Sequence, residues 1–424
     1  MTKQKYFYYI SIILMASAFL PLVFNNLPPV IRSHHLYTTI WGLSLLFFYP
    51  KIFLSKIMQY LVFYGLFFFL ATNLIWYNID KMNYYLIFYE FYYITVGVTV
   101  ITYFIQVKDY LNLAKLVKWS LIFLLITAIM SIVSSFIDPM YARNILNQAS
   151  ITLISEFDNV MKFRKLGGGT YSTAIAFMSL FPILIYSYKN KGSSFFSVTQ
   201  IIFFSIIFFM ALLGIQLFAN IMISILIIFI SILGIKKINR SLITLILIFS
   251  IAFIIPTNIY ISTLNTLSNA FSTKSDINFK LNDLAMFLET GAEIETNSTS
   301  AGLKAGRYPM LFESFRKSPF LGCYFLSDEY ANGYNEAGRH LYWMNKLTTT
   351  GILGMILFLF IPFYHLKKLL KNINSEFKFF FLIASFSVLG YGFFKAIDGR
   401  EAWYTFFIII PGFYYLPLLK KTKK

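Results

Sequence analysis

The chain has 424 residues, of which 58% are hydrophobic, 20% are aromatic and only 13% are charged. Soluble domains carry about 25% charged residues, so this composition excludes a water-soluble fold. The formal net charge is +18, but most lysines and arginines lie in short segments between long apolar blocks, which indicates membrane topology and not nucleic-acid binding. One cysteine, Cys323, excludes an intramolecular disulfide and a cysteine-cluster metal site.

The long apolar blocks are the pattern expected when each must cross about 30 Å of hydrocarbon as a helix. The first block follows Met1–Lys5 without a small-residue cleavage site, so we expect a retained first helix. Several blocks are short, which predicts tilted helices or irregular ends. The sequence therefore predicts an all-α polytopic membrane protein of about 12 transmembrane helices. The predicted spans are Tyr6–Phe24, Leu36–Tyr49, Met58–Tyr77, Tyr84–Ile105, Trp119–Ile137, Tyr171–Tyr188, Val198–Leu217, Asn220–Ile235, Leu242–Ile261, Leu347–Phe363, Phe379–Phe394 and Trp403–Leu419.

Basic residues orient these spans. If the N-terminus is cytoplasmic, every inner connection is basic, from Met1–Lys5 through Lys108–Lys118 to the tail Lys420–Lys424. The positive-inside rule therefore places both termini in the cytoplasm. Two longer segments, 138–170 and 262–346, then face outward. Loops of that length among tight turns usually carry function, so the larger one is the predicted functional loop.

Three parts of the chain follow from this topology. Residues 1–261 hold nine spans and the smaller outer loop 138–170. Residues 262–346 form the large outer loop, in which we expect short helices. Residues 347–424 hold the last three spans and the basic cytoplasmic tail.

The large loop carries a helical signal of its own. Tyr308, Leu311, Phe312 and Phe315 follow the i, i+3, i+4, i+7 spacing of an amphipathic helix. A helix lying on the membrane surface explains this pattern without any further function. The functional alternative is that Arg307 directs its guanidinium toward the membrane-facing side of the loop. The residue types alone leave both interpretations open.

Several short motifs occur in a fixed order around this loop. They are Arg164–Tyr171 with its three glycines, Ala305–Tyr308, Ser318–Gly322, and His340 eleven residues before Gly351, which begins the next helix. In this order and spacing they resemble the motifs of the O-antigen polymerase and O-antigen ligase superfamily.

One departure from that family stands between two predicted spans. The family commonly carries an arginine at the outer junction that here reads Gln216–Asn220. Either Arg164 takes over its role or the donor phosphate is held differently.

The resemblance implies a GT-C-like membrane glycosyltransferase of the bacterial inner membrane, with its active site at the periplasmic face. Its donor would be an undecaprenyl-pyrophosphate-linked oligosaccharide. The acceptor would be a sugar hydroxyl, on a lipid-linked repeat unit for a polymerase or on the lipid A core for a ligase. We favour the polymerase, because the glycine segment and the missing arginine look more like the divergent polymerases. Membrane lipid and a chain-length regulator protein are the other expected partners; no nucleic acid, metal or other cofactor is implied.

The resemblance also suggests roles for particular residues. Arg307 and Arg164 would neutralise the leaving pyrophosphate, because a guanidinium hydrogen-bonds two oxygens at once. His340 would take the proton of the acceptor hydroxyl, with substrate positioning or a structural hydrogen bond as alternatives. Candidate substrate-binding residues, which a solvated surface explains as well, are Arg339, Glu336, Asn345, Arg316 and Lys304.

Two other features have alternative explanations. Gly167–Gly169 lacks the P-loop spacing, so a tight turn into the next span is the simpler interpretation. The charged turn from Lys395 to Glu401 either closes one side of the site or is only solvated.

A lipid-linked sugar flippase or another transporter is the main alternative of a different class. Transporters place ionisable groups within their helices along a pathway. This chain has few such groups, Glu90 being the clearest, and concentrates its polar residues in one outer loop. The sequence therefore favours an enzyme.

Overall fold

The computed structural model describes residues 2–75, 84–139, 141–146, 161–191, 194–215, 218–233, 256–270, 276–290, 300–322, 341–397 and 399–421. Regular structure in these residues is helical throughout, which confirms the predicted all-α class. Within the described residues four helices are long and apolar enough to cross a membrane, and Ala219–Leu233 is a shorter apolar helix. The four are Tyr110–Ile137, Met161–Lys189, Val198–Ile215 and Tyr342–Leu370.

Helices of the first half pack mainly around α7 and α10. Helix α7 contacts α1 and α11, and α10 contacts α11, α12 and the later helix α19. The helices are α1 (Lys3–Phe19), α2 (Pro21–Phe24), α3 (Pro29–Arg32), α4 (His34–Phe48), η1 (Pro50–Leu54), α5 (Lys56–Ile75), α6 (Tyr84–Gln106), α7 (Tyr110–Ile137), α8 (Tyr141–Leu146), α10 (Tyr171–Lys189), α11 (Val198–Ile215) and α12 (Phe218–Leu233).

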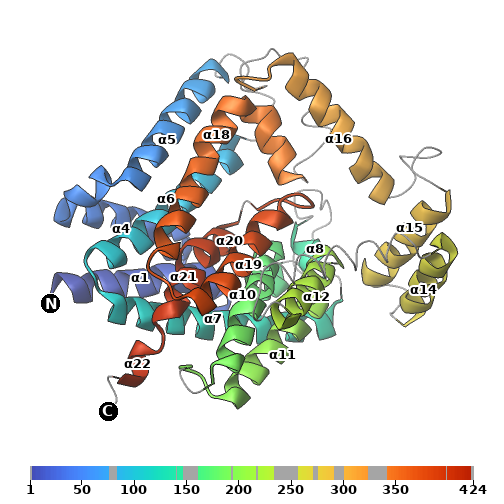
Figure 1. The fold of residues 1–424 in the computed structure, drawn as a ribbon, viewed down its shortest axis with the longest axis horizontal. Helices are drawn as coiled ribbons and strands as arrows, with labels where there is room; N and C mark the ends of the chain where they lie inside the picture. The colour runs from blue at the N-terminus through green and yellow to red at the C-terminus, as the bar shows by residue number, and fades with distance from the viewer. Residues whose placement is uncertain are drawn as a thin grey trace.

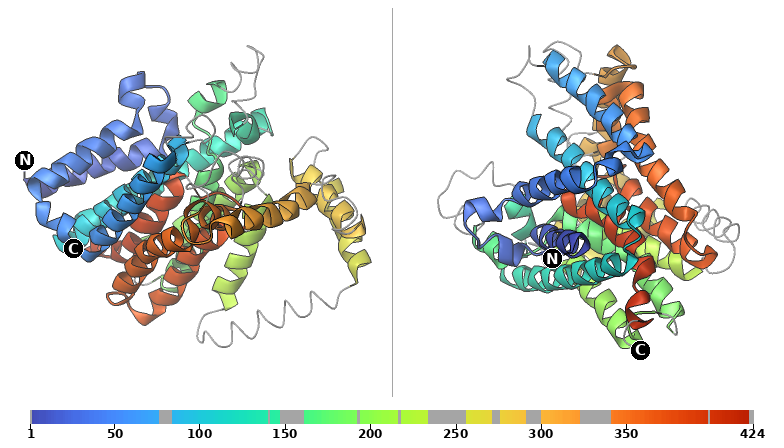
Figure 2. Two further views of the ribbon diagram at one scale, coloured as in Figure 1. Left: turned by 90° about the horizontal axis from the view of Figure 1, so that it is seen from above. Right: turned by 90° about the vertical axis from the view of Figure 1, so that its left-hand side faces the viewer.

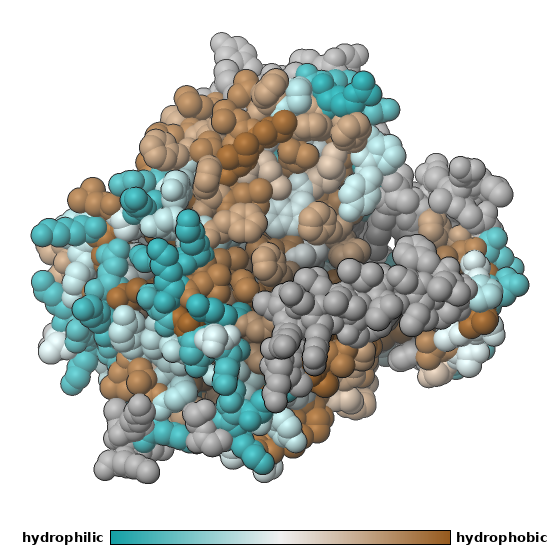
Figure 3. Space-filling model, viewed as in Figure 1, coloured by the Kyte–Doolittle hydropathy of each residue, from teal (hydrophilic) through white to brown (hydrophobic). Residues whose placement is uncertain are grey.

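In the second half, helices leave the bundle and return to it (Figure 1). Figure 2 places both termini at one end of the molecule and the pair α14 and α15 at the opposite end. Hydrophobic surface covers α5 and α18, and hydrophilic residues gather near the termini (Figure 3). The helices are α14 (Thr257–Asn269), α15 (Asp276–Thr290), α16 (Ser300–Lys317), α18 (Tyr342–Leu370), α19 (Ser375–Tyr391), α20 (Arg400–Tyr404), η5 (Thr405–Ile409), α21 (Ile410–Gly412), η6 (Phe413–Tyr415) and α22 (Leu418–Lys421).

Aromatic side chains fill the middle of the bundle. Trp403 stacks on Phe407 with ring centroids 5.9 Å apart, and both are fully buried. Trp41 is buried as well and donates its Nε1–H to Ser11 Oγ at 2.8 Å. The polar end of the Trp41 indole is therefore paired, whereas Trp403 Nε1 has no hydrogen-bond partner among the described residues.

Helix α7 begins earlier than the predicted span. The predicted inner connection Lys108–Lys118 is largely helical, because α7 starts at Tyr110 and not at Trp119. Asp109 caps the helix, with its side chain accepting from the Asn112 N–H at 3.4 Å. Lys115 and Lys118 therefore belong to its first turns, and Lys115 Nζ lies 5.8 Å from the centre of the Tyr8 ring.

Prolines divide two of the predicted continuous spans. The first ends at Phe19 and resumes as α2 at Pro21, whose missing N–H interrupts the helix ladder. The last span contains a π-helical turn at Thr405–Ile409, directly before Pro411. These irregular segments replace the uniform helices predicted over Tyr6–Phe24 and Trp403–Leu419.

The large outer loop is bounded differently from the prediction. Helix α14 begins at Thr257, inside the predicted ninth span, most of which lies outside the described residues. At the other end α18 begins at Tyr342, so Asn345 and Lys346, at the end of the predicted loop, lie in its first turns. Helix α16 confirms the helical signal found around Arg307.

A break at Gly351 divides α18 into two parts. The turn that follows α16 is hydrogen-bonded to the backbone at this break. Gly351 has φ +63°, and Gly322 has φ +84°. The Ile352 N–H donates to Pro319 O at 2.8 Å, and the Leu353 N–H donates to Phe320 O at 3.1 Å. The two glycine-containing motifs are therefore one interlocked junction.

Both glycines of this junction are required by close approach of the backbones. A Cβ at Gly322 would lie 2.2 Å from Thr349 O, and a Cβ at Gly351 would lie 2.3 Å from Phe320 O. Their left-handed φ angles are a second reason, because side chains other than glycine rarely adopt them.

Candidate functional site

The three-glycine segment fastens residues 161–170 to the first helices. Asn25 Nδ2 donates to Arg164 O at 2.8 Å, and Asn26 Nδ2 donates to Lys165 O at 2.9 Å. Gly167 has φ +76°, and a Cβ there would lie 2.4 Å from the Leu22 backbone. These contacts fix the backbone position of Arg164, from which its side chain extends.

The same glycines use their polar groups for packing. The Gly169 N–H donates to Ser131 Oγ at 2.7 Å, and the Tyr141 hydroxyl donates to Gly169 O at 3.1 Å. A Cβ at Gly168 would lie 2.8 Å from the Tyr141 ring. The contacts agree with the predicted tight turn into α10, since the Gly169 amide already has a protein partner.

Arg164 and Arg32 form an exposed pair of like charges. Their guanidinium groups lie close enough to interact electrostatically. Neither has an ion pair with a carboxylate in the part of the chain that the structure describes. Two neighbouring guanidiniums without such a partner are suited to an anion with several oxygens.

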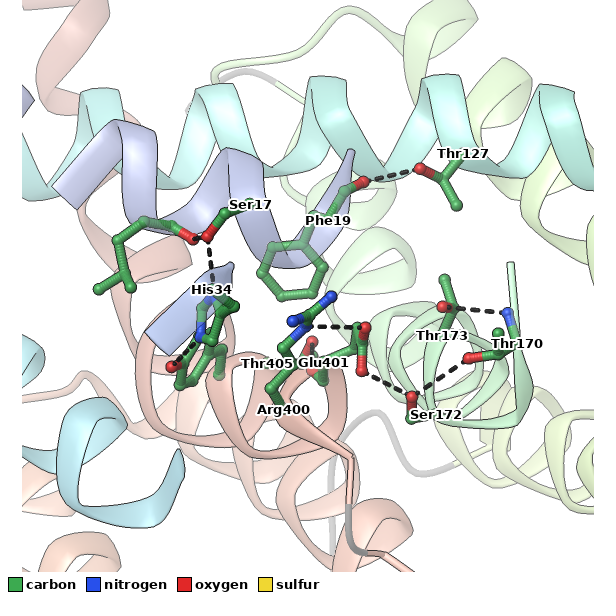
Figure 4. A network of polar contacts seen from close by, with 12 residues as sticks. Ser17, Phe19, His34, Thr127, Thr170, Ser172, Thr173, Arg400, Glu401 and Thr405 are labelled. Atoms are coloured by element: carbon green, nitrogen blue, oxygen red, sulfur yellow. Dashed lines mark hydrogen bonds and ion pairs between the residues drawn. The ribbon is translucent and has the colours of Figure 1, made fainter. Parts of the chain in front are cut away.

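Arg400 lies at the start of the last helical segment, in a network that reaches α10. Its Nε is 3.3 Å from Glu401 Oε1, and Glu401 Oε2 accepts a hydrogen bond of 2.6 Å from the Ser172 hydroxyl (Figure 4). The Thr405 hydroxyl donates to Glu401 O at 2.7 Å. The Nη groups of Arg400 make no hydrogen bond to a described residue, so they remain donors for a ligand.

His34 is buried beside Arg400, and both of its ring nitrogens are occupied. Nδ1 lies 2.6 Å from Ser17 Oγ, and Nε2 lies 2.8 Å from the Tyr404 hydroxyl. Ser17 gives its own proton to Leu14 O at 2.7 Å, so Nδ1 donates to Ser17 and Nε2 accepts from Tyr404. His34 is therefore a structural residue.

Arg32, Arg164 and Arg400 together form what we call the arginine cluster. Arg400 is an electrostatic neighbour of both His34 and His35, which follow Arg32 closely in the chain. Figure 4 shows the Arg400 guanidinium between His34 and Glu401. Arg400 is thus a neighbour of the first residues of α4, and Arg32, which precedes α4, is a neighbour of Arg164.

Arg307 lies on α16, which is fastened to the bundle at two points. The Tyr308 hydroxyl donates to Phe393 O at 2.7 Å, and the Thr348 hydroxyl donates to Leu311 O at 3.0 Å. Burial raises the pKa of Tyr308 above its ordinary value. Phe393 belongs to the turn that leads to Arg400, whereas Arg307 is itself partly exposed.

The remaining predicted site residues are spread over several environments. His340, Arg339 and Glu336 lie outside the described residues. Asn345 is buried in α18, and Arg316 is exposed at the end of α16. Lys304 also lies on α16, but its side chain is not among those described. No group of three metal-ligating side chains occurs within the described ranges.

A buried ion pair was missed by the sequence analysis. Lys346 Nζ of α18 lies 2.7 Å from Glu90 Oε2 of α6, with both side chains less than a tenth exposed. The hydroxyl of Tyr342 donates to Glu90 Oε1, and Lys346 also donates to the Tyr64 hydroxyl at 3.2 Å. Glu90 was recognised as an intramembrane charge, but Lys346 was assigned to the loop. The signal was its position five residues before Gly351, within reach of the next apolar span.

Comparisons with protein-family models, with curated proteins and with solved structures found no match. The family resemblance of the sequence motifs therefore remains a hypothesis, and any assignment of function rests on the geometry of the described residues.

Proposed function

We propose that this protein is a membrane glycosyltransferase that polymerises O-antigen at the periplasmic face of the bacterial inner membrane. In this proposal twelve spans cross the membrane, both termini are cytoplasmic, and the segments 138–170 and 262–346 face the periplasm. The donor is an undecaprenyl-pyrophosphate-linked glycan, and the acceptor is a sugar hydroxyl of a lipid-linked repeat unit.

The arginine cluster is the observation that supports this proposal most. Arg400 is paired with Glu401, whereas the like charges of Arg32 and Arg164 lie close to each other. A pyrophosphate diester carries two negative charges. Arg164 and Arg32 have no carboxylate partner among the described residues, and Arg400 has free Nη donors. This arrangement suits an anion at the end of the bundle that the positive-inside rule assigns to the periplasm.

The chemistry needs one proton acceptor and one stabilised leaving group. The acceptor oxygen forms a bond to the anomeric carbon of the donor sugar while the bond from that carbon to the pyrophosphate oxygen breaks. The hydroxyl proton passes to His340 in this proposal, and undecaprenyl pyrophosphate leaves with an additional negative charge. Guanidinium groups placed in advance stabilise this developing charge without having to reorganise.

Arg307 is the third predicted participant, and its helix supports an accessory role. Helix α16 is tied through Tyr308 to the turn that leads to Arg400. This connection links the helix that carries Arg307 to the turn that precedes Arg400. We therefore assign Arg307 to the same donor site, with Arg32 and Arg400 in the role left open by the arginine missing from Gln216–Asn220.

Two alternatives remain distinct from the polymerase. A ligase would use the same donor and transfer the glycan to the lipid A core. A flippase is favoured by the intramembrane pair Glu90 and Lys346, because buried charges often mark a transport pathway. However, each charge is paired with the other and with a tyrosine hydroxyl, as expected for a structural contact.

The deciding experiment is the lipopolysaccharide banding pattern of cells that lack this gene, with and without the wild-type gene supplied on a plasmid. A polymerase predicts that the ladder collapses to core plus one repeat and returns with the plasmid. Core without any O-antigen, together with accumulated lipid-linked polymer, would identify a ligase. Lipid-linked repeat units trapped on the cytoplasmic side would identify a flippase and overturn the proposal.

A further inference from the structure

A groove lies between the last turns of α18 and the first half of α19. These two helices follow each other in the chain, but they pack on different neighbours, α18 on α5 and α19 on α10 and α12. The space between them has a volume of about 450 Å³. Because both helices continue away from the short turn 371–374, the groove opens at the end of the bundle that carries this turn.

The walls of this groove divide into an apolar part and a basic part. Phe363 and Phe386 are 49% and 50% exposed, which is the exposure expected of lipid-facing side chains. Lys367 and Lys371, four residues apart on α18, line the groove together with Lys378 of α19. No acidic residue lines it.

The three lysines have no counter-charge in the described part of the chain. None of their ammonium groups has a hydrogen bond or an ion pair with a described residue. Glu376 is the nearest carboxylate along the chain, but it lies outside the groove and interacts electrostatically with Tyr186. Three like charges that converge on one apolar groove repel one another unless an anion lies between them.

We propose that this groove binds one anionic phospholipid of the cytoplasmic leaflet. The headgroup phosphate contacts Lys367, Lys371 and Lys378, and one acyl chain lies along Phe363 and Phe386. The site belongs to the end of α18 that the positive-inside rule places in the cytoplasm, where anionic headgroups are available. It is separate from the arginine cluster and does not depend on the proposed glycosyl transfer.

The test is native mass spectrometry of the purified full-length protein, with phosphatidylglycerol or phosphatidylcholine of the same acyl chains. We expect the wild type to retain one phosphatidylglycerol with a preference of at least about tenfold. The triple variant Lys367→Gln, Lys371→Gln, Lys378→Gln should lose this preference, and the triple arginine variant should keep it because the charges remain.

A matched control removes the same charge elsewhere. Lys5→Gln, Lys51→Gln and Lys191→Gln replace exposed lysines outside the groove and should leave the preference unchanged. Equal retention of both lipids by the wild type, or the same loss in this control, would overturn the proposal. Displacement of the lipid by millimolar inorganic phosphate would also overturn it, because the site would then recognise phosphate without the acyl chain.

Discussion

Arg32, Arg164 and Arg400 come from three segments that are far apart in the sequence, and each starts from a fixed backbone. Asn25 holds the Arg164 carbonyl, Arg32 ends α3, and Arg400 is held through Glu401 and Ser172. A fixed backbone reduces the conformational freedom that each arginine loses when it binds an anion. For this reason we assign the proposed donor site to the arginine cluster and not to the lysines around it.

Replacement of Arg164 by lysine tests the guanidinium itself. Arg164→Lys keeps the charge but loses the fork that donates to two oxygens, so we expect polymer formation to fall by about 10²-fold. The measurement is the O-antigen ladder made by membranes containing equal amounts of each variant. Lys162→Gln changes an exposed neighbour in the same segment and should retain full activity. Normal polymer from Arg164→Lys would remove Arg164 from the donor site.

His340 is the second test at this scale. If it is the general base, His340→Ala should lower the transfer rate by about 10²–10⁴-fold while the protein still inserts and binds donor lipid. The rate of the wild type should fall as pH drops below the pKa of the imidazole, because a protonated ring cannot accept the hydroxyl proton. An unchanged rate, or the same acid limb in the alanine variant, would mean that another group accepts this proton.

At the scale of elements, Glu90 and Lys346 join α6 to α18 near the point where the large loop ends. Removing one partner of a buried ion pair leaves an unpaired charge and costs about 3–5 kcal/mol. We therefore expect Glu90→Gln and Lys346→Met each to lower the thermal midpoint in detergent. The double variant Glu90→Leu, Lys346→Met should recover much of the loss. A double variant no more stable than the single ones would show that the residues do not act as a pair.

Replacement of Gly351 by alanine tests whether the break in α18 is needed for docking of the large loop. Gly351→Ala places a Cβ 2.3 Å from Phe320 O and costs at least about 1–2 kcal/mol for the left-handed backbone alone. We expect lower yield of folded protein and faster proteolysis of the loop. Gly390→Ala on α19 is the matched control, because a Cβ there meets nothing within 4 Å. Equal proteolysis of the two variants would show that the junction is not needed for loop docking.

The sequence predicted most helices well, for physical reasons that also explain its errors. Apolar blocks place helix centres such as those of α5 and α10 within a few residues. They do not reveal where a helix continues into polar residues, as α7 does at Lys115, or where Pro21 interrupts one. The arginine cluster was only partly predicted, because Arg32 and Arg400 meet the Arg164 region through tertiary contacts that no local spacing encodes.

On the scale of the whole molecule, the two ends differ in the chemistry they present. Both termini lie toward one end, and α14, α15 and α16 extend from the other (Figures 1 and 2). The lysine-lined groove lies where α18 ends and α19 begins. The basic connections predict that the end with the termini faces the cytoplasm. The proposed donor site and the proposed lipid site would therefore face opposite leaflets.

Labelling from outside the cell tests this orientation. With Cys323→Ser as background, Lys165→Cys should react with a membrane-impermeant maleimide in intact cells, whereas Lys371→Cys should react only after the membrane is opened. Both positions are exposed in the structure, so a difference in labelling reports the side of the membrane. The reverse pattern would contradict the assignment of the arginine cluster to the periplasm.

The glycine junction also bears on how the protein is made. The first N–H groups after the break in α18 are satisfied by Pro319 O and Phe320 O, about thirty residues earlier in the chain. Hydrocarbon offers no water to replace these partners, so an undocked junction leaves polar backbone groups unpaired. In the proposed orientation, residues 318–322 are synthesised first and cross the membrane ahead of Gly351. We therefore expect α18 to reach its final packing only after residues 318–322 have docked at Gly351.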